Sequence, residues 1–343
     1  MNVTAARPVT ENSQVAEGRR LVLWLASRLD FSEERAGQAA LIATELGTNL
    51  AKHAREGELL VRPLTTADGD PAGIEMLSLD KGPGMREEAV ARRDGYSTAG
   101  TLGHGLGAIQ RQADQLEIYT HPSGTAIAAR IWRERPAVDT GQSRFEVGAV
   151  HVSKTGEDVC GDDWGWRQRN GRLAIFIADG LGHGLHAHDA ATAALRVFAT
   201  GYEQSPRLLI TDVHAALRPT RGAAVAMLAV DLERRTGAFA GLGNIAGQIL
   251  LPSGGRHNMV SHNGTAGHAA GSIHEFTYPV PPKCTIVMFS DGLTSRWDLT
   301  AYPGLGNQSP ALIAGILYRD FSRRRDDVTV VVARERRPIA DIQ

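Results

Sequence analysis

The most regular hydrophobic pattern near the start of the chain lies in the segment DFSEERAGQAALIATELGTNLAKHA, residues 30–54. Its apolar positions recur at spacings of three and four, which predicts an amphipathic helix with one face in a core. The residues of that face are Ala36, Ala39, Ala43, Leu46 and Leu50. Asp30 or Ser32 can cap the helix, because either side chain can accept a hydrogen bond from a free N–H of the first turn. Glu45 and Asn49 are four residues apart, so they lie one above the other on a different face.

Four further patterns complete the first part of the chain. The segments GIEMLSLD (73–80) and GTAIAARIW (124–132) are largely apolar and predict strands. The segment GLGAIQRQADQLEIY (105–119) predicts a second helix that is entered through glycines, and KGPGM (81–85) predicts a turn. This order favours an α/β sandwich with its helices on one side of a sheet.

The second part of the chain alternates differently. Strands are predicted at 145–152, 172–178, 223–231, 237–251, 285–290 and 328–333, and helices at 186–203 and 309–322. Long strands joined by turns such as ERRTG favour a mainly antiparallel β-sandwich with flanking helices.

A polar stretch, RERPAVDTGQSR (133–144), separates these two parts and is typical of a linker. We therefore predict an α+β chain in which an α/β-sandwich domain is followed by a β-sandwich domain flanked by helices. The predicted boundaries are an N-terminal domain at 1–134, a linker at 135–144, a C-terminal domain at 145–335 and a tail at 336–343.

Length and composition agree with two domains and narrow the functional classes. A chain of 343 residues exceeds what one hydrophobic core usually organises. A net charge of -1 gives no reason to expect nucleic acid or an anionic membrane as a partner. The two cysteines, Cys160 and Cys284, cannot form a disulfide framework or a CxxC metal site. No apolar run has the length of a signal-peptide core or a membrane span, so we predict a cytoplasmic protein whose oligomeric state stays open.

The pentapeptide LGHGL occurs twice, at 102–106 and at 181–185. The first copy follows the loop sequence DGYSTAG and leads into a helical pattern, whereas the second follows LAIFIADG, a predicted buried strand that ends in an acidic residue. The flanking sequences do not align, which indicates two separate sites and argues against an internal repeat.

The first copy lies in a sequence context suited to phosphate binding. Glycines at a helix N-terminus let backbone N–H groups approach phosphate oxygens without a side chain in the way. Upstream, the carboxylate of Asp80 follows a predicted strand and can accept a hydrogen bond from an exocyclic amine, while Glu45 and Asn49 offer a base and an oxygen ligand for Mg²⁺.

These segments resemble a known family. TELGTNLAKHA, LDKGPGM, DGYSTAGTLGHGLGAI and SGTAIAARIW are similar, in that order, to the N, G1, lid with G2, and closing motifs of the GHKL-type ATPases. The resemblance covers about residues 15–132 and is strongest to the bacterial anti-sigma-factor serine kinases, in particular the RsbT-like stressosome switch kinases. It implies the Bergerat α/β-sandwich fold, ATP and Mg²⁺ as cofactors, and transfer of phosphate to a serine or threonine.

The same resemblance implies a role for individual residues. Asn49 binds Mg²⁺, Glu45 orients or deprotonates the acceptor hydroxyl, and Asp80 reads the adenine. The glycines that shape the nucleotide loops, and the threonine that closes over the adenine end, are Gly82, Gly84, Gly103, Gly105, Gly107 and Thr125. His104 receives no role.

The second LGHGL copy lies among aspartates at predicted strand ends. These are Asp162 with Asp163, Asp179, Asp291, and Asp326 with Asp327. One acidic residue at a strand end often only terminates the strand. Several carboxylates at one sheet edge repel one another unless divalent cations neutralise them, and Mg²⁺ or Mn²⁺ prefers such oxygen ligands. Two ions in one site can activate water for attack on a phosphate.

This second region also resembles a family. GDDW, ADGLGHG, GLGNIAG, SDGLTS and DDVTVVV are similar to motifs of the SpoIIE-type branch of the PP2C serine/threonine phosphatases, with the closest likeness to the RsbX-like stressosome feedback phosphatases, over about 145–334. The resemblance implies two Mn²⁺ or Mg²⁺ ions, held by Asp162, Asp179, the Gly180 carbonyl, Asp291 and Asp326, with Asp179 and Asp291 in catalysis. Asp163 and Asp327 are adjacent alternatives for two of these positions.

Two further residues lie in the motifs of this second region, and their roles are less specific. Asn244 belongs to the glycine-asparagine turn and is interpreted as structural. His183 either donates a proton to the leaving serine oxygen or only fills the glycine turn.

The two resemblances together lead to a functional hypothesis. One chain would phosphorylate a serine or threonine of a partner from ATP and would also hydrolyse that phosphate. By resemblance the partner is a STAS-domain protein, either an anti-sigma antagonist or a stressosome subunit. Two alternatives are an ATP-binding regulatory module fused to a phosphatase, without kinase activity, and a catalytically inactive scaffold.

Overall fold

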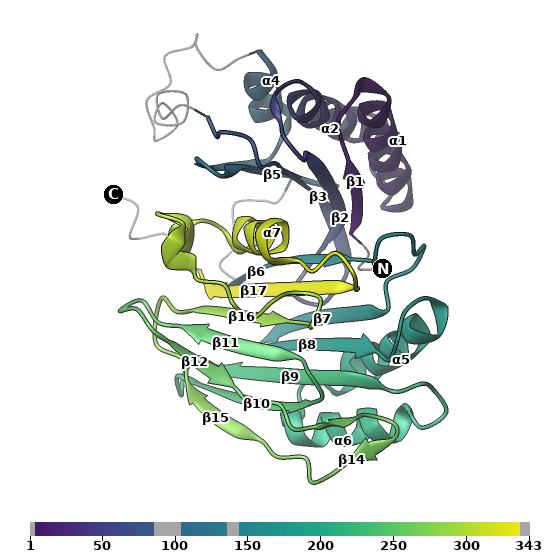
Figure 1. Cartoon of the computed structure of the whole chain (residues 1–343), viewed down its shortest axis with the longest axis vertical. Helices are drawn as coiled ribbons and strands as arrows, with labels where there is room; N and C mark the ends of the chain where they lie inside the picture. The colour runs from purple at the N-terminus through teal and green to yellow at the C-terminus, as the bar shows by residue number, and fades with distance from the viewer. Residues whose placement is uncertain (1–3, 86–103, 136–143, 337–343) are drawn as a thin grey trace.

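The computed structural model describes residues 4–85, 104–135 and 144–336. The N-terminal part contains one antiparallel sheet in the order β1-β2-β3-β5-β4. Its strands are β1 (Ala5–Pro8), β2 (Glu58–Thr65), β3 (Pro71–Leu79), β4 (Gln115–His121) and β5 (Gly124–Trp132). The helices α1 (Asn12–Arg28), α2 (Glu33–His53) and α4 (His104–Gln112) cover one face of this sheet (Figure 1).

Helix α2 is the amphipathic helix that the sequence predicts. Ser32 is its N-cap and accepts a hydrogen bond from the backbone N–H of Arg35 at 3.3 Å, whereas Asp30 lies in the preceding turn with a positive φ. The core face packs on the sheet, with Ile42 and Leu46 buried against strand residues such as Met76. Burial on this face leaves Glu45 and Asn49 on another face of the helix, as predicted.

The predicted second helix is too long. Helix α4 ends at Gln112, and the residues from Gln115 form strand β4, which pairs with β5. Asp114 separates the two elements, because its side chain accepts hydrogen bonds from the Trp132 backbone N–H at 2.9 Å and from the Arg35 guanidinium. The alternating apolar residues Leu116 and Ile118 fit a strand as well as a helix.

The C-terminal part is a β-sandwich of two five-stranded antiparallel sheets, in the orders β15-β10-β9-β8-β7 and β12-β11-β16-β17-β6. The strands of the first are β7 (Asp162–Arg169), β8 (Arg172–Gly180), β9 (Ala223–Asp231), β10 (Thr236–Leu242) and β15 (Phe276–Pro279). Those of the second are β6 (Phe145–Val152), β11 (Ala246–Leu250), β12 (Arg256–Met259), β16 (Thr285–Phe289) and β17 (Val328–Glu335). A small pair, β13 (Gly264–Thr265) and β14 (Ala269–Ala270), stands apart. Apolar side chains from both sheets fill the space between them.

Helices cover the outer faces of the sandwich. Helices α5 (Leu185–Gly201) and α6 (Pro206–Ala216) pack on the sheet that contains β8, and α7 (Pro310–Phe321) packs on β6 and β17. Two short 3₁₀ turns, η1 (Leu299–Ala301) and η2 (Leu305–Asn307), precede α7. The structure thus confirms the predicted α+β fold class.

The predicted strand 237–251 is two strands in different sheets. The chain leaves β10 at Leu242 and enters β11 at Ala246, so it crosses from one sheet to the other. Gly243 makes this crossing with a φ of +104°, and a Cβ there would overlap Ala224. Several elements were not predicted, among them strands β1, β2, β7, β12 and β15 and helices α1 and α6. Strand β7, for example, carries mostly polar and tryptophan side chains and lacks an apolar run.

Helix α7 lies between the N-terminal sheet and the β-sandwich (Figure 1). Every residue from Pro310 to Arg319 is buried, because the uncovered face of the N-terminal sheet packs on one side of the helix and β6 with β17 on the other. Polar contacts border this interface: the Tyr318 hydroxyl donates to Glu58 Oε1 at 3.0 Å, and Arg130 donates to Glu146 Oε1 at 3.2 Å. The two parts are therefore joined by a buried apolar interface in addition to residues 136–143, which lie outside the described residues.

Among the described residues, no helix combines the length and the hydropathy that crossing a membrane requires. The boundaries at 134, 144 and 335 stay predictions.

Candidate functional site

A cavity of about 480 Å³ opens between α2, the end of β3 and the start of α4. This volume is within the range of about 300–1,000 Å³ that is usual for cofactor sites. The predicted nucleotide-site residues that line it are Glu45, Asn49, Asp80, Gly84, Gly105 and Thr125. Residues from four separate segments of the sequence therefore meet in one concave site.

Glu45 and Asn49 face the first turn of α4. A Cβ added at Gly105 would lie 2.8 Å from Glu45 Oε2 and 3.4 Å from Asn49 Oδ1. The glycine thus allows the helix N-terminus to approach the two side chains closely, which a larger residue would prevent. The N-terminal end of a helix favours negative charge, such as a phosphate, at this position.

Asp80 lies directly after β3 and is half-buried. Its Oδ1 accepts a hydrogen bond from the Gly82 N–H at 2.6 Å, and its own N–H donates to the Thr125 carbonyl at 3.0 Å. Burial raises the pKa of the Asp80 carboxyl, and hydrogen bonds from Gly82 and Thr125 together with the charge of Arg319 partly offset that rise. The carboxylate is held by its own turn and faces the cavity.

Of the other described glycines of the first motif set, Gly82 and Gly107 do not line this cavity. Gly82 acts through its N–H on Asp80, and Gly107 lies within α4, where an added Cβ would meet only Arg111 at 3.4 Å. Gly103 and the preceding lid sequence lie outside the described residues.

The aspartates of the second motif set gather at one edge of the β-sandwich. Asp162 and Asp179 are direct partners in the β7–β8 pairing, so their side chains point to the same face. Asp291 follows the end of β16, and Asp326 precedes the start of the antiparallel neighbour β17, which places both at a shared edge. The structure therefore brings together the residues that the sequence assigned to one metal site.

Asp162 is the most buried of these carboxylates, with 1% of the residue exposed. Its Oδ2 accepts hydrogen bonds from Ser290 Oγ at 2.7 Å and from Thr329 Oγ1 at 2.8 Å, which join the two sheets at this edge. Its Oδ1 is buried and has no hydrogen-bond partner among the described residues. Burial, opposed in part by the two hydroxyls, raises the pKa of this carboxyl.

The neighbouring carboxylates interact through their charges. Burial first, and then the charges of Asp162, Asp291 and other aspartates, raise the pKa of Asp179. Burial and the charge of Asp326 raise the pKa of Asp291, whose Oδ2 accepts a hydrogen bond from Asn244 Nδ2 at 2.7 Å. Asn244 is thus more than a turn residue, because its amide holds one of the cluster carboxylates.

The structure separates the members of the two Asp-Asp pairs. Asp163 follows Asp162 in β7, and its Oδ1 accepts a hydrogen bond from the N–H of Trp164. Asp327 is buried and accepts a hydrogen bond from the Lys154 N–H at 2.8 Å, whereas Asp326 is exposed at the edge. The choice of Asp162 over Asp163 and of Asp326 over Asp327 stays a prediction, since Asp327 Oδ2, like Asp162 Oδ1, is a buried oxygen without a hydrogen-bond partner among the described residues.

Gly180 and His183 lie in the segment that follows Asp179. A Cβ at Gly180 would overlap the carbonyl of Ala187, so the backbone of this position approaches α5 directly. His183 is 54% exposed, and its Nδ1 lies 2.6 Å from Glu157 Oε1. The Glu157 contact fixes the ring, and a proton-donating role for His183 stays a prediction.

The carboxylate cluster has the donor chemistry of a divalent-cation site. Within the described residues, no three His, Cys, Asp or Glu side chains already surround one point as a ligand set. The cluster nevertheless supplies hard oxygen donors only, its carboxylates repel one another, and Asp162 Oδ1 is a buried oxygen without a donor. Oxygen donors of this kind fit Mg²⁺ or Mn²⁺.

The raised pKa values of Asp162 and Asp179 predict how the metal-free protein responds to pH. A carboxyl whose pKa is raised by folding binds protons more tightly in the folded state. The resulting stability is present near the unfolded pKa of about 3.9 and is lost as the pH rises through the raised pKa values. With EDTA present, we expect the melting temperature to fall as the pH increases from weakly acidic to alkaline, and Mn²⁺ to reverse the fall. A melting temperature that is independent of both pH and Mn²⁺ would contradict the cluster.

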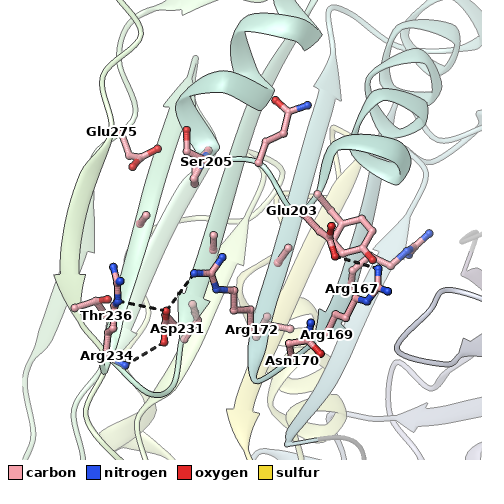
Figure 2. Close-up of a pocket in the computed structure, with 18 of the residues that line it drawn as sticks. Arg167, Arg169, Asn170, Arg172, Glu203, Ser205, Asp231, Arg234, Thr236 and Glu275 are labelled. Carbon is pink, nitrogen blue, oxygen red and sulfur yellow. Dashed lines mark hydrogen bonds and ion pairs between the residues drawn. The ribbon is translucent and has the colours of Figure 1, made fainter.

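Further cavities lie in the β-sandwich, and two of them are large. One of about 740 Å³ adjoins the turn after Asp179 and is lined by residues that include Leu181, His186, Arg221 and His268. The other, of about 880 Å³, lies at the opposite end of β8, where Figure 2 shows Arg172 and Arg234 facing Asp231, and Arg169 facing Glu203. None of the predicted site residues lines this second cavity.

Comparisons with known proteins assign a family likeness to each part of the chain. The model of the histidine kinase-like ATPase domain matches residues 9–131, and the model of stage II sporulation protein E (SpoIIE) matches residues 169–336. The chain is 29% identical to the serine/threonine-protein kinase RsbT of Bacillus subtilis (strain 168) over 130 residues, which cover 38% of this chain and 96% of RsbT. It is 25% identical to the phosphoserine phosphatase RsbX of the same organism over 186 residues, which cover 53% of this chain and 90% of RsbX.

Solved structures agree with the second assignment. One similar chain comes from a structure described as the bacterial stressosome, a modular system adapted to control secondary messenger signalling. It is 26% identical to this chain with a TM-score of 0.53, and the match covers 56% of this chain and 100% of that chain. RsbX in complex with magnesium has the same fold at 22% identity and a TM-score of 0.51, with 56% of this chain and 96% of RsbX covered. The matches follow the order of the two motif sets along the chain and confirm both resemblances.

Proposed function

Because the chain joins a histidine kinase-like ATPase domain to a SpoIIE-type PP2C domain, we propose that it is a bifunctional regulator that phosphorylates and dephosphorylates a partner protein. The observation that carries this proposal is the presence of two separate polar sites in one chain. One is a cavity lined by Glu45, Asn49 and Asp80, and the other is the aspartate cluster of the β-sandwich. The domain boundaries at 134, 144 and 335 form part of the proposal.

In the proposed kinase reaction, a serine or threonine oxygen of the partner attacks the γ-phosphorus of ATP, and the bond from that phosphorus to the ADP oxygen breaks. Glu45 takes the hydroxyl proton or orients the hydroxyl, and Asn49 would hold Mg²⁺, which would neutralise phosphate charge. Asp80 accepts a hydrogen bond from the adenine amine. The glycine-rich N-terminus of α4 provides backbone N–H groups for the phosphates.

In the proposed phosphatase reaction, water attacks the phosphorus of a phosphoserine or phosphothreonine, the phosphorus–oxygen bond to the side chain breaks, and the departing oxygen takes a proton. Two bound Mg²⁺ or Mn²⁺ ions would lower the pKa of the attacking water and neutralise the phosphate charge. The residues proposed to hold them are Asp162, Asp179, the Gly180 carbonyl, Asp291 and Asp326. Ser290, Thr329 and Asn244 orient these carboxylates through their hydrogen bonds.

The proposed partner is a STAS-domain protein of a sigma-factor or stressosome switch. RsbT and RsbX, to which the two parts are similar, are by name a protein kinase and a phosphoserine phosphatase of one organism. The likeness to a stressosome chain supports the same setting.

A second candidate function keeps the phosphatase and makes the first domain an ATP-binding regulator without kinase activity. The contact of Arg319, on α7, with the Asp80 carbonyl favours this candidate, because it connects the β-sandwich to the nucleotide cavity.

A phosphate balance distinguishes the two candidates. The full chain is incubated with a STAS-domain protein encoded near its gene, [γ-³²P]ATP and Mg²⁺, and then chased with unlabelled ATP and Mn²⁺. We expect label to appear on the partner and then to leave as inorganic phosphate. Label that never appears, while a pre-phosphorylated partner loses its phosphate, would reduce the first domain to a regulator. A partner that neither gains nor loses phosphate would overturn both candidates for that protein.

A further inference from the structure

The last turn of α7 places a buried arginine next to the backbone of Asp80, a residue that lines the cavity of the first domain. The Arg319 side chain is 2% exposed, and its Nη1 donates a hydrogen bond to the backbone carbonyl of Asp80 at 2.8 Å. Its Nε and Nη2 donate to the two carboxylate oxygens of Asp320, each at 2.8 Å. All three guanidinium nitrogens therefore have an acceptor, and one of them reaches across from the β-sandwich to the ATPase domain.

The backbone of Asp80 depends on this contact. Strand β3 ends at Leu79, and the Asp80 N–H is bound by Thr125 on β5, so the Asp80 carbonyl needs a partner from elsewhere. Gly124 leaves room for that partner: its φ is +137°, and a Cβ there would overlap the Asp80 carbonyl oxygen and lie 2.7 Å from Arg319 Nη1. The backbone of Asp80 is thus held at its N–H by Thr125 on β5 and at its carbonyl by Arg319 on α7. These two contacts orient the Asp80 carboxylate toward the cavity.

The arginine itself is anchored within the β-sandwich domain. Asp320 Oδ2 also accepts a hydrogen bond from the Tyr302 hydroxyl at 2.8 Å. Beside this pair, the Tyr119 hydroxyl on β4 donates to the Pro303 carbonyl at 3.2 Å. The guanidinium is therefore fixed before it meets Asp80, because a planar fork bound at two oxygens has little rotational freedom.

We propose that Arg319 is a positioning residue for nucleotide recognition, supplied by the phosphatase domain to the ATP site of the other domain. Arg319 does not contact the nucleotide but fixes the peptide whose side chain reads the adenine amine. This inference rests on the proposed function, since it requires ATP to bind in the cavity around Asp80.

The segment after Arg319 connects the same contact to the carboxylate cluster. The Phe321 carbonyl accepts a hydrogen bond from the Thr294 N–H at 3.0 Å, and the Arg323 N–H donates to the Gly292 carbonyl at 2.8 Å. These bonds tie the chain between α7 and Asp326 to the loop that contains Asp291. A shift at the end of α7 therefore changes the separation of two proposed metal ligands, so nucleotide binding and Mn²⁺ binding are expected to influence each other.

The test uses the full chain and compares Arg319→Ala and Arg319→Lys with Arg324→Ala. Arg324 lies on the same segment and makes an interdomain ion pair with Glu58 at 3.1 Å but does not contact Asp80. The probes are the nonhydrolysable analogues AMPPNP and GMPPNP with Mg²⁺, measured by calorimetry. Circular dichroism confirms that each variant is folded.

For Arg319→Ala we expect the affinity for AMPPNP to fall by about tenfold or more, because a buried carbonyl loses its donor and the adenine-reading peptide loses its position. The affinity for GMPPNP, which relies on the phosphates, should change much less, so the preference for adenine over guanine falls. Arg319→Lys keeps one donor and should retain more of that preference. Arg324→Ala should alter both affinities by less than about threefold.

An unchanged adenine preference in both Arg319 variants of a protein that binds AMPPNP would overturn the inference while leaving the proposed function intact. A wild-type chain that binds no AMPPNP would instead overturn the ATP site itself. Mn²⁺ binding measured with and without AMPPNP tests the coupling. We expect the Mn²⁺ affinity of the wild-type chain to change by about fivefold or more and the change to vanish in Arg319→Ala. Equal Mn²⁺ affinities in the wild-type chain would show that the segment after Arg319 carries no coupling.

Discussion

Replacing Asp179 with asparagine is expected to abolish the proposed phosphatase reaction while leaving ATP-dependent phosphate incorporation intact. Asp179 lies opposite Asp162 in the β7–β8 pairing, and its carboxylate interacts with the other aspartates of the cluster. The neutral amide removes one negative charge and one anionic oxygen donor from the proposed ion site. We expect Mn²⁺-dependent release of phosphate from a phosphorylated partner to fall by about a hundredfold or more. The fall should be accompanied by weaker Mn²⁺ binding in calorimetry.

Asp163→Asn is the matched control for this experiment. It makes the same chemical change, from carboxylate to amide, at the residue that follows Asp162 in β7. The Oδ1 of Asp163 accepts a hydrogen bond from the Trp164 N–H. The phosphatase rate of this variant should stay within about threefold of the wild-type rate, because Asp163 is not one of the residues proposed to hold the ions. If Asp163→Asn were inactive and Asp179→Asn active, the carboxylate assignment would be wrong.

Replacing Glu45 with glutamine should have the opposite effect on the two activities. The amide keeps the size of the side chain that faces Gly105 but can no longer take a proton from the acceptor hydroxyl. Phosphate incorporation into the partner should therefore fall by about a hundredfold or more, the usual contribution of a general base. Phosphatase turnover and AMPPNP binding should stay close to the wild-type values. Radiolabel transfer, phosphate release and calorimetry measure the three quantities on one preparation.

The control for Glu45→Gln is Glu34→Gln, which lies in the exposed first turn of the same helix. It should leave all three measurements unchanged. Persistent phosphate incorporation by Glu45→Gln would show that Glu45 is not the base, and loss of AMPPNP binding would show that it acts in nucleotide binding.

Local patterns in the sequence indicated where both candidate sites lie in the fold, and the roles of their residues stay predictions. The spacing of Glu45 and Asn49 placed them on one face of α2, and the position of Asp179 at the end of an apolar run placed it at a sheet edge. Local patterns did not distinguish Asp162 from Asp163, because that choice depends on which face of β7 meets the other sheet. The hydroxyls of Ser290 and Thr329 were missed for the same reason, although each is next to or near an aspartate at a strand end.

The helix predicted at 309–322 is α7, but its burial between the two domains was not predicted, although the sequence contained a signal for it. The segment PALIAGILY is apolar on all sides, and a helix that is apolar all round is buried on more than one side. A helix that covers only a β-sandwich needs one apolar face. The contact of Arg319 with Asp80 could not be predicted, because it joins residues far apart in the chain through a surface that exists only after both sheets have formed.

Helix α7 packs between the N-terminal sheet and the β-sandwich of one chain, so the two proposed activities would always be present in equal copy number. When separate enzymes add and remove a phosphate, the modified fraction of the substrate drifts whenever one gene is expressed more than the other. A chain that carries both proposed activities changes both maximal rates by the same factor when its copy number changes. Variation in expression then leaves the steady-state phosphorylated fraction of the substrate unchanged. The modified fraction would then respond only to influences that act unequally on the two sites, such as the supply of ATP or of divalent cations.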